Sequence, residues 1–181
     1  MWSFGLFAGL AVEEDFMDRK DILELSEYYL WAEERLLGSL ETMKQEDFEK
    51  DLHSSHGGIR GTLLHILNAE NTWTRRLSGE PVVPLDDSKL KSLDDFKREW
   101  DHLDRKLAAM LDGLTDENLQ SRFDYQDMKG NKYSHPRIWA FQQLFNHFTY
   151  HRGQIVAMQR QLGCKPANTD LIGFYREKKS V

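Results

Sequence analysis

The chain has 181 residues, a formal net charge of −6 and 40% hydrophobic residues, enough for one domain with a buried core. The negative charge argues against nucleic acid or an anionic membrane surface as the main partner, because both require a basic patch. A single cysteine, Cys164, excludes an internal disulfide framework and a cysteine zinc site, and it fits a reducing, cytoplasmic setting.

The first 16 residues are unusually apolar. They lack the basic residue that precedes the apolar run of a signal peptide, and no apolar run in the chain reaches the roughly 20 residues that a membrane span needs. We therefore interpret residues 1–16 as an N-terminal extension and residues 17–181 as the domain, with Met17 as a candidate native start.

Four long segments carry apolar residues at three- and four-residue steps, which predicts amphipathic helices. They cover residues 18–43, 58–77, 92–114 and 134–163. Ser92 is a good N-cap, and Gly163 is typical of the residue that follows a helix. Four such helices predict an all-α four-helix bundle, and some connections are long enough for a crossover.

Residues 121–135 show a different pattern. Phe123, Tyr125 and Tyr133 flank a turn that contains Gly130. This predicts a small hairpin or an extended loop before the last long helix. That helix is expected to begin at Ser134 or His135, with Pro136 in its first turn.

Two histidines on the last helix are the first chemical signal. His147 and His151 lie four residues apart, so their side chains leave the same side of the helix, about 6 Å apart along it. Both imidazoles can then reach one metal ion at about 2.0–2.1 Å. A spacing of four alone also fits two ordinary bundle histidines.

His65 strengthens the metal interpretation. It lies near the middle of the second helix, on an edge with the small residues Thr62 and Ala69, which leave room for an ion. If that edge faces the last helix, His65, His147 and His151 form a set of three neutral nitrogen ligands with an open position. Such a set suits zinc, nickel, iron or copper, whereas magnesium and calcium prefer oxygen ligands.

Two charged residues fall within apolar stripes, Glu70 on the second helix and Arg152 on the fourth. An isolated buried charge is costly, so we predict that the two pair and fix the register of these helices. The alternative is that each side chain extends to water at the bundle end.

Four histidines need no special role. His53 and His56 lie in a polar loop and are expected to be solvated, and His102 lies among charged residues on an outer helix face. His135 is expected to cap a helix or face water.

Four segments of the chain resemble the DinB-like superfamily of metalloenzymes. Residues 146–154 match its H-x3-H-R-G-Q signature, and residues 64–73 are similar to its H-x4-E-x2-W segment. Residues 29–32 resemble the aromatic element of its first helix, and residues 170–175 its closing motif. The resemblance covers about residues 18–178. Glu33-Glu34 departs from it, because many members carry asparagine after the Trp-Ala pair.

The resemblance implies a four-helix bundle that often forms homodimers, with His65, His147 and His151 as the metal ligands. For such a histidine site we expect zinc or nickel first, with iron, manganese or copper as further choices. Some branches transfer low-molecular-weight thiols such as bacillithiol or mycothiol, so the expected partner is a small-molecule substrate, with no nucleic acid or membrane. The resemblance indicates a metal site more firmly than a reaction.

Two functions remain open at this point. The first is a metal-dependent enzyme, a thiol S-transferase or a hydrolase, in which the ion activates an exogenous thiol or water. Asp170, Tyr150 and Tyr175 are weak candidates for acid-base roles, and Cys164 is expected to be an ordinary near-surface thiol. The absence of an H-E-x-x-H motif argues against a protease. The second function is a non-catalytic metal-binding stress-response or sensor module that acts as a dimer.

Overall fold

A computed structural model describes residues 17–178 and confirms the all-helical expectation. Its long helices are α1 (Arg19–Leu40), α3 (Ile59–Leu77), α4 (Leu93–Asp112) and α6 (Arg137–Gln161). The short helices are α2 (Gln45–Glu49), η1 (Asp87–Lys89), α5 (Asp116–Gln120) and α7 (Leu171–Lys178). The extension predicted at residues 1–16 lies outside the described residues.

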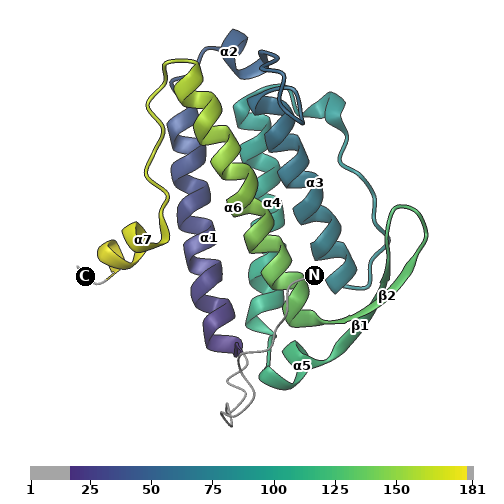
Figure 1. Ribbon diagram of the computed structural model, residues 1–181. Coiled ribbons are helices and arrows are strands. Elements are labelled where there is room, and N and C mark those ends of the chain that lie inside the picture. The colour runs from purple at the N-terminus through teal and green to yellow at the C-terminus, as the bar shows by residue number, and fades with distance from the viewer. Residues whose placement is uncertain (1–16, 179–181) are drawn as a thin grey trace, which may run out of the picture.

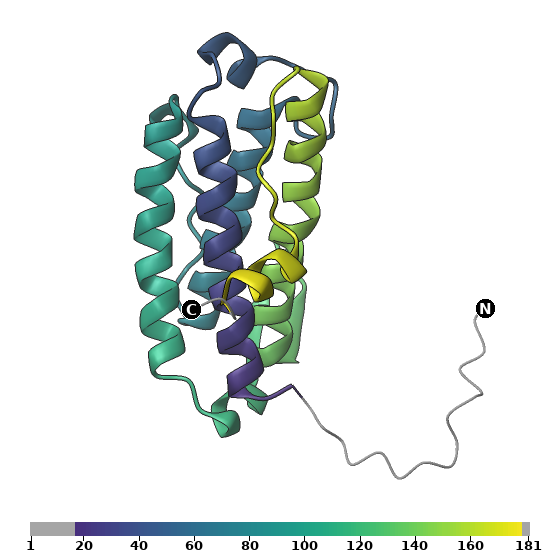
Figure 2. The same ribbon diagram turned by 90° about the vertical axis from the view of Figure 1, so that its left-hand side faces the viewer.

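The four long helices form one bundle in which α3 and α6 are neighbours, α1 packs against α4 and α6, and α3 also packs against α4 (Figures 1 and 2). Each helix buries one apolar stripe, and the centre is filled by large side chains such as Trp100, Phe141 and Phe148, each 2% exposed or less. This follows from the three- and four-residue apolar spacing.

The helix directions confirm the expected crossover. Arg60 at the start of α3 donates to the Leu90 carbonyl just before α4, so these neighbouring helices begin at the same end. Residues 78–92 therefore return along the length of the bundle (Figure 1). By contrast, Arg137 at the start of α6 donates to the Leu77 carbonyl at the end of α3, which makes α3 and α6 antiparallel.

The sequence predicted either a small hairpin or an extended loop before the last long helix, and the structure shows a hairpin. Strands β1 (Arg122–Gln126) and β2 (Lys132–Pro136) pair in antiparallel register, and Gly130 turns the chain with a φ of 84°. The predicted helix start was wrong, because His135 pairs with Phe123 in this ladder. Pro136 therefore ends the strand, and α6 begins at Arg137.

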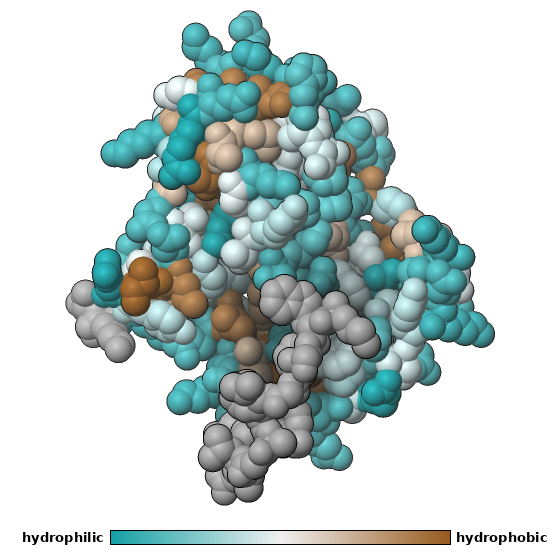
Figure 3. Space-filling view, viewed as in Figure 1, coloured by the Kyte–Doolittle hydropathy of each residue, from teal (hydrophilic) through white to brown (hydrophobic). Residues whose placement is uncertain are grey.

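Polar side chains cover most of the face shown in Figure 3, and apolar atoms appear there only in small separate areas. None of the helices among residues 17–178 is long and apolar enough to span a bilayer.

Candidate metal centre

The contact between α3 and α6 brings His65, His147 and His151 together. The Nε2 atom of His147 lies 3.1 Å from Nε2 of His65 and 3.1 Å from Nε2 of His151. The ring centroids of His65 and His151 are 4.5 Å apart. The structure thus brings the three histidines expected from the sequence together, with Nε2 of His147 close to Nε2 of both others.

These distances fit a shared metal ion. Two nitrogens that each lie about 2.0–2.1 Å from one ion and 3.1 Å from each other subtend about 100° at it. Two of the three pairs of ring nitrogens thus have the spacing of neighbouring ligands of one ion.

Hydrogen bonds alone satisfy the cluster poorly. The Nε2 atom of a neutral imidazole carries either one hydrogen or one lone pair in the ring plane. Nε2 of His147 faces two other ring nitrogens at once, so one hydrogen or one lone pair would have to serve both contacts. A cation among the three lone pairs removes this conflict.

Gln154 prepares His151 for such a role. The Nδ1 atom of His151 lies 2.8 Å from Oε1 of Gln154, one turn further along α6. The amide oxygen can only accept, so the hydrogen of neutral His151 lies on Nδ1 and the Nε2 lone pair faces the cluster. Gln154 belongs to the H-R-G-Q segment, but no role was predicted for it. Its position three residues after His151 was the available signal.

The environment keeps two of the three rings, His65 and His147, uncharged at neutral pH. Burial, followed by the neighbouring histidines, lowers the pKa of His65 and of His147 to about 4. Both rings are half-buried and His151 is buried. At neutral pH the rings of His65 and His147 are therefore unprotonated and retain a lone pair for a cation.

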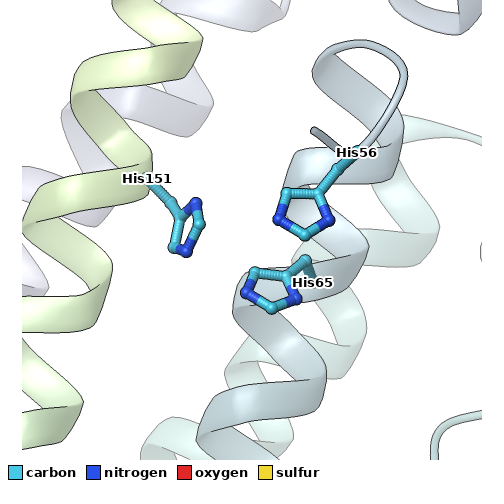
Figure 4. Close-up of side chains that lie close together, drawn as sticks. All are labelled: His56, His65 and His151. Carbon is cyan, nitrogen blue, oxygen red and sulfur yellow. The ribbon is translucent and has the colours of Figure 1, made fainter. Parts of the chain in front are cut away.

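A fourth histidine joins this cluster, which corrects the expectation that His56 is simply solvated. Its ring stacks on that of His65 with centroids 3.9 Å apart and meets the edge of His151 at 5.3 Å (Figure 4). Donor atoms of His56, His65 and His151 lie within 4.8 Å of one another. The loop before α3 thus contributes to the site.

The three weak acid-base candidates are placed differently. The Tyr150 ring meets His151 edge-on at 4.9 Å and is 65% exposed. Tyr175 lies in α7, and Asp170 directly precedes this helix. Helix α7 packs beside α1, away from the face between α3 and α6 (Figure 1). The structure therefore brings only Tyr150 to the histidines.

Glu70 and Arg152 are both buried but do not pair, so the predicted ion pair was wrong. Oε2 of Glu70 accepts from the Tyr29 hydroxyl at 2.6 Å and from Nε1 of Trp100 at 2.8 Å. Arg152 donates to the Tyr28 hydroxyl, and its guanidinium lies 5.2 Å from the ring centres of Tyr28 and Phe148. Aromatic faces and a hydroxyl can hold a buried guanidinium without a carboxylate.

Glu70 instead belongs to a cluster of carboxyl groups with Glu33 and Asp104. Burial raises the pKa of Glu70 to about 8 and that of Asp104 to about 7, and nearby acidic groups add to both effects. Burial also raises the pKa of Glu33 well above its usual value. In the part of the chain that the structure describes, each of the three carboxyl groups has one buried oxygen with no hydrogen-bond partner.

The remaining histidines lie away from the cluster. His53 and His102 are exposed, as expected. The expectation for His135 was wrong, because it lies in β2 and its Nδ1 is 3.0 Å from the Tyr125 hydroxyl. Cys164 is partly buried just after α6.

The fold and the cluster define a helical-bundle protein with histidines that could hold a metal ion. The chain belongs to the DinB family, whose model matches residues 17–179. It is 24% identical over 160 residues to Protein DinB of Bacillus subtilis (strain 168), covering 84% of this chain and 91% of that protein. It is also similar in fold to a DinB-like protein from Bacillus cereus ATCC 10987, with a TM-score of 0.57 and 18% identity over 84% of this chain and 98% of that one.

Proposed function

We propose that His65, His147 and His151 bind one divalent transition metal and that the chain is a metal-dependent enzyme acting on an exogenous thiol or water. The observation that carries this proposal is the convergence of the three Nε2 atoms, with contacts of 3.1 Å that hydrogen bonds alone satisfy poorly. The family match supports it.

The donor set favours zinc or nickel, and iron, manganese or copper are further choices. A bound ion of this kind lowers the pKa of a thiol or water at its open position and so supplies a nucleophile at neutral pH.

The protein side chains position the reactants in this proposal. The three histidines hold the ion from one side, Gln154 fixes the orientation of the His151 ring, and Tyr150 borders the site. A protein nucleophile is not needed, because the attacking group comes from the small-molecule substrate. A thiol S-transferase is the version that the family resemblance favours.

A non-catalytic metal-binding module, acting in stress response or as a sensor, is the second candidate. The position of Asp170 and Tyr175 beside α1 favours it, because the two are then too remote to act as acid or base at the histidines. The homodimer and the cytoplasmic setting also stay expectations.

Metal content separates these proposals from a purely structural cluster. Elemental analysis of protein purified without a metal-affinity column should find close to one ion per chain. His147→Ala should remove it, whereas His53→Ala, which changes an exposed histidine, should not. Equal metal content in the wild type and His147→Ala would overturn the site. Thiol-dependent turnover by the metal-loaded protein, lost in His147→Ala, would then distinguish the enzyme from the binding module.

A further inference from the structure

His56 lies next to the proposed metal site without belonging to its ligand set. It comes from the loop before α3, whereas the three proposed ligands lie on α3 and α6. Figure 4 shows the His56 ring above that of His65, with His151 opposite both.

The stacking geometry argues against His56 as a ligand of the same ion. A metal binds an imidazole nitrogen through the lone pair in the ring plane. The rings of His56 and His65 are nearly parallel, with an interplanar angle of 15° and centroids 3.9 Å apart. Because stacked rings direct their in-plane lone pairs along separate planes, His56 and His65 would not readily share one ion.

The loop holds His56 in this position through close backbone packing. A Cβ atom on Gly61 in the first turns of α3 would lie 1.9 Å from the His56 carbonyl oxygen. Gly57 adopts a φ of 79°, and its carbonyl accepts from Leu52 at 2.9 Å and from Ser54 at 3.1 Å. The fixed backbone favours one ring position.

The ring nitrogens of His56 are available to another molecule. No hydrogen bond joins them to any of residues 17–178, and the ring is only half-buried. One nitrogen lies within 4.8 Å of donor atoms of both His65 and His151. This nitrogen therefore faces the same space as the donor atoms of His65 and His151, where a small exogenous ligand would need a hydrogen-bond partner.

We propose that His56 is a positioning residue that hydrogen-bonds the exogenous thiol or water at the open coordination position and does not bind the metal. The role rests on the proposed function. It assigns to the loop before α3 the task of selecting and orienting what the ion binds.

Cobalt(II) is a suitable probe because its visible absorption reports the ligands around the ion. The full chain is loaded with Co²⁺, and its affinity for Co²⁺ and then for 2-mercaptoethanol is measured by absorption. Four variants are compared with the wild type: His56→Phe, which keeps a stacking ring without nitrogen; His56→Gln, which keeps a hydrogen-bonding group; His53→Ala, an exposed control in the same loop; and His147→Ala.

For His56→Phe we expect unchanged Co²⁺ affinity and spectrum but thiol binding weaker by about 10- to 100-fold, the usual effect of losing one hydrogen bond to a charged group. His56→Gln should recover part of the thiol affinity, and His53→Ala should match the wild type. Thiol affinity unchanged in His56→Phe overturns the inference and leaves the metal site intact. A large loss of Co²⁺ affinity in His56→Phe also overturns it, because His56 is then a ligand. Equal Co²⁺ binding by the wild type and His147→Ala overturns the proposed function itself.

Discussion

The bundle contains two clusters of ionisable side chains, and α3 contributes to both. His65 belongs to the histidine cluster and Glu70 to the carboxyl cluster, and a separation of five residues directs them about 140° apart around the helix. Burial is the first cause of the pKa shifts in both places. It lowers the pKa of His65 to about 4 and raises that of Glu70 to about 8, so both groups are mostly neutral at pH 7.

The same neutral state has different chemical consequences in the two clusters. A neutral imidazole retains a lone pair that can bind a metal, whereas a neutral carboxyl group gains a hydrogen-bond donor. The carboxyl cluster is also linked to the core, because Glu70 accepts from Tyr29 and Trp100. In our proposal the histidine cluster serves ligand binding and the carboxyl cluster serves stability.

The largest expected effect is on metal affinity, which a substitution in the histidine cluster should lower far more than one in the carboxyl cluster. His65→Ala should weaken binding of Zn²⁺ by at least about 100-fold, since loss of a direct ligand should exceed the roughly 10–100-fold effect of losing an outer-shell partner. Glu70→Gln should change it by less than about threefold. Competition with a chromophoric chelator measures both. Equal losses in the two variants would remove the distinction.

The free energy of unfolding should respond in the opposite way, with a larger loss from the carboxyl cluster than from the histidine cluster. Glu70→Ala should lower the free energy of unfolding by about 2–4 kcal/mol, because the Tyr29 hydroxyl and the Trp100 indole lose their buried acceptor. In the metal-free protein His65→Ala should cost less than about 1 kcal/mol, because the ring is only half-buried and its contact with His147 is a poorly satisfied hydrogen bond. Urea unfolding without metal tests this, and a larger cost for His65→Ala would contradict it.

The pH dependence of stability follows from the sign of each shift. Glu70 holds its proton in the folded state up to a pKa of about 8 against an ordinary value of 4.5, so its contribution is complete below pH 4.5 and is lost as the pH rises through 8. The free energy of unfolding of the metal-free protein should fall by about 2 kcal/mol between pH 6 and 8 from this group. Glu70→Gln should flatten this slope. An unchanged slope in the variant would show that the shift of Glu70 is not its source.

The smallest expected effect concerns Gln154, the residue that orients His151 in the histidine cluster. Gln154→Ala should weaken Zn²⁺ binding by about tenfold, because His151 loses the acceptor that fixes its hydrogen on Nδ1. Gln143→Ala, which changes an exposed position on the same helix, is the matched control. The same chelator competition measures both, and equal affinities in the two variants would leave Gln154 without a role.

The sequence predicted the elements that depend on local periodicity. The four long helices and the crossover follow from apolar spacing and loop length. A spacing of four residues predicts only the pair of His147 and His151, and His65 joined them through the small residues on its helix edge and the family resemblance. The predicted start of the last helix lay too early in the chain. His135 pairs instead with Phe123, and this pairing depends on a strand on the other side of the hairpin turn.

The errors concern contacts across elements. Glu70 and Arg152 each appeared to need an ionic partner, but Trp100 and Tyr28, from other helices, hydrogen-bond them instead. His56 was set aside because its loop is polar. Only the packing of that loop against Gly61 of α3 brings the ring over His65.

The central claim is that three histidines hold an ion that keeps a position open for an exogenous ligand. X-ray absorption of the Zn²⁺-loaded full chain, before and after addition of 2-mercaptoethanol, tests this most directly. We expect three imidazole nitrogens at about 2.0–2.1 Å, and one sulfur at about 2.3 Å after the thiol is added. A spectrum without imidazole, or one with four protein ligands that the thiol leaves unchanged, would contradict the account.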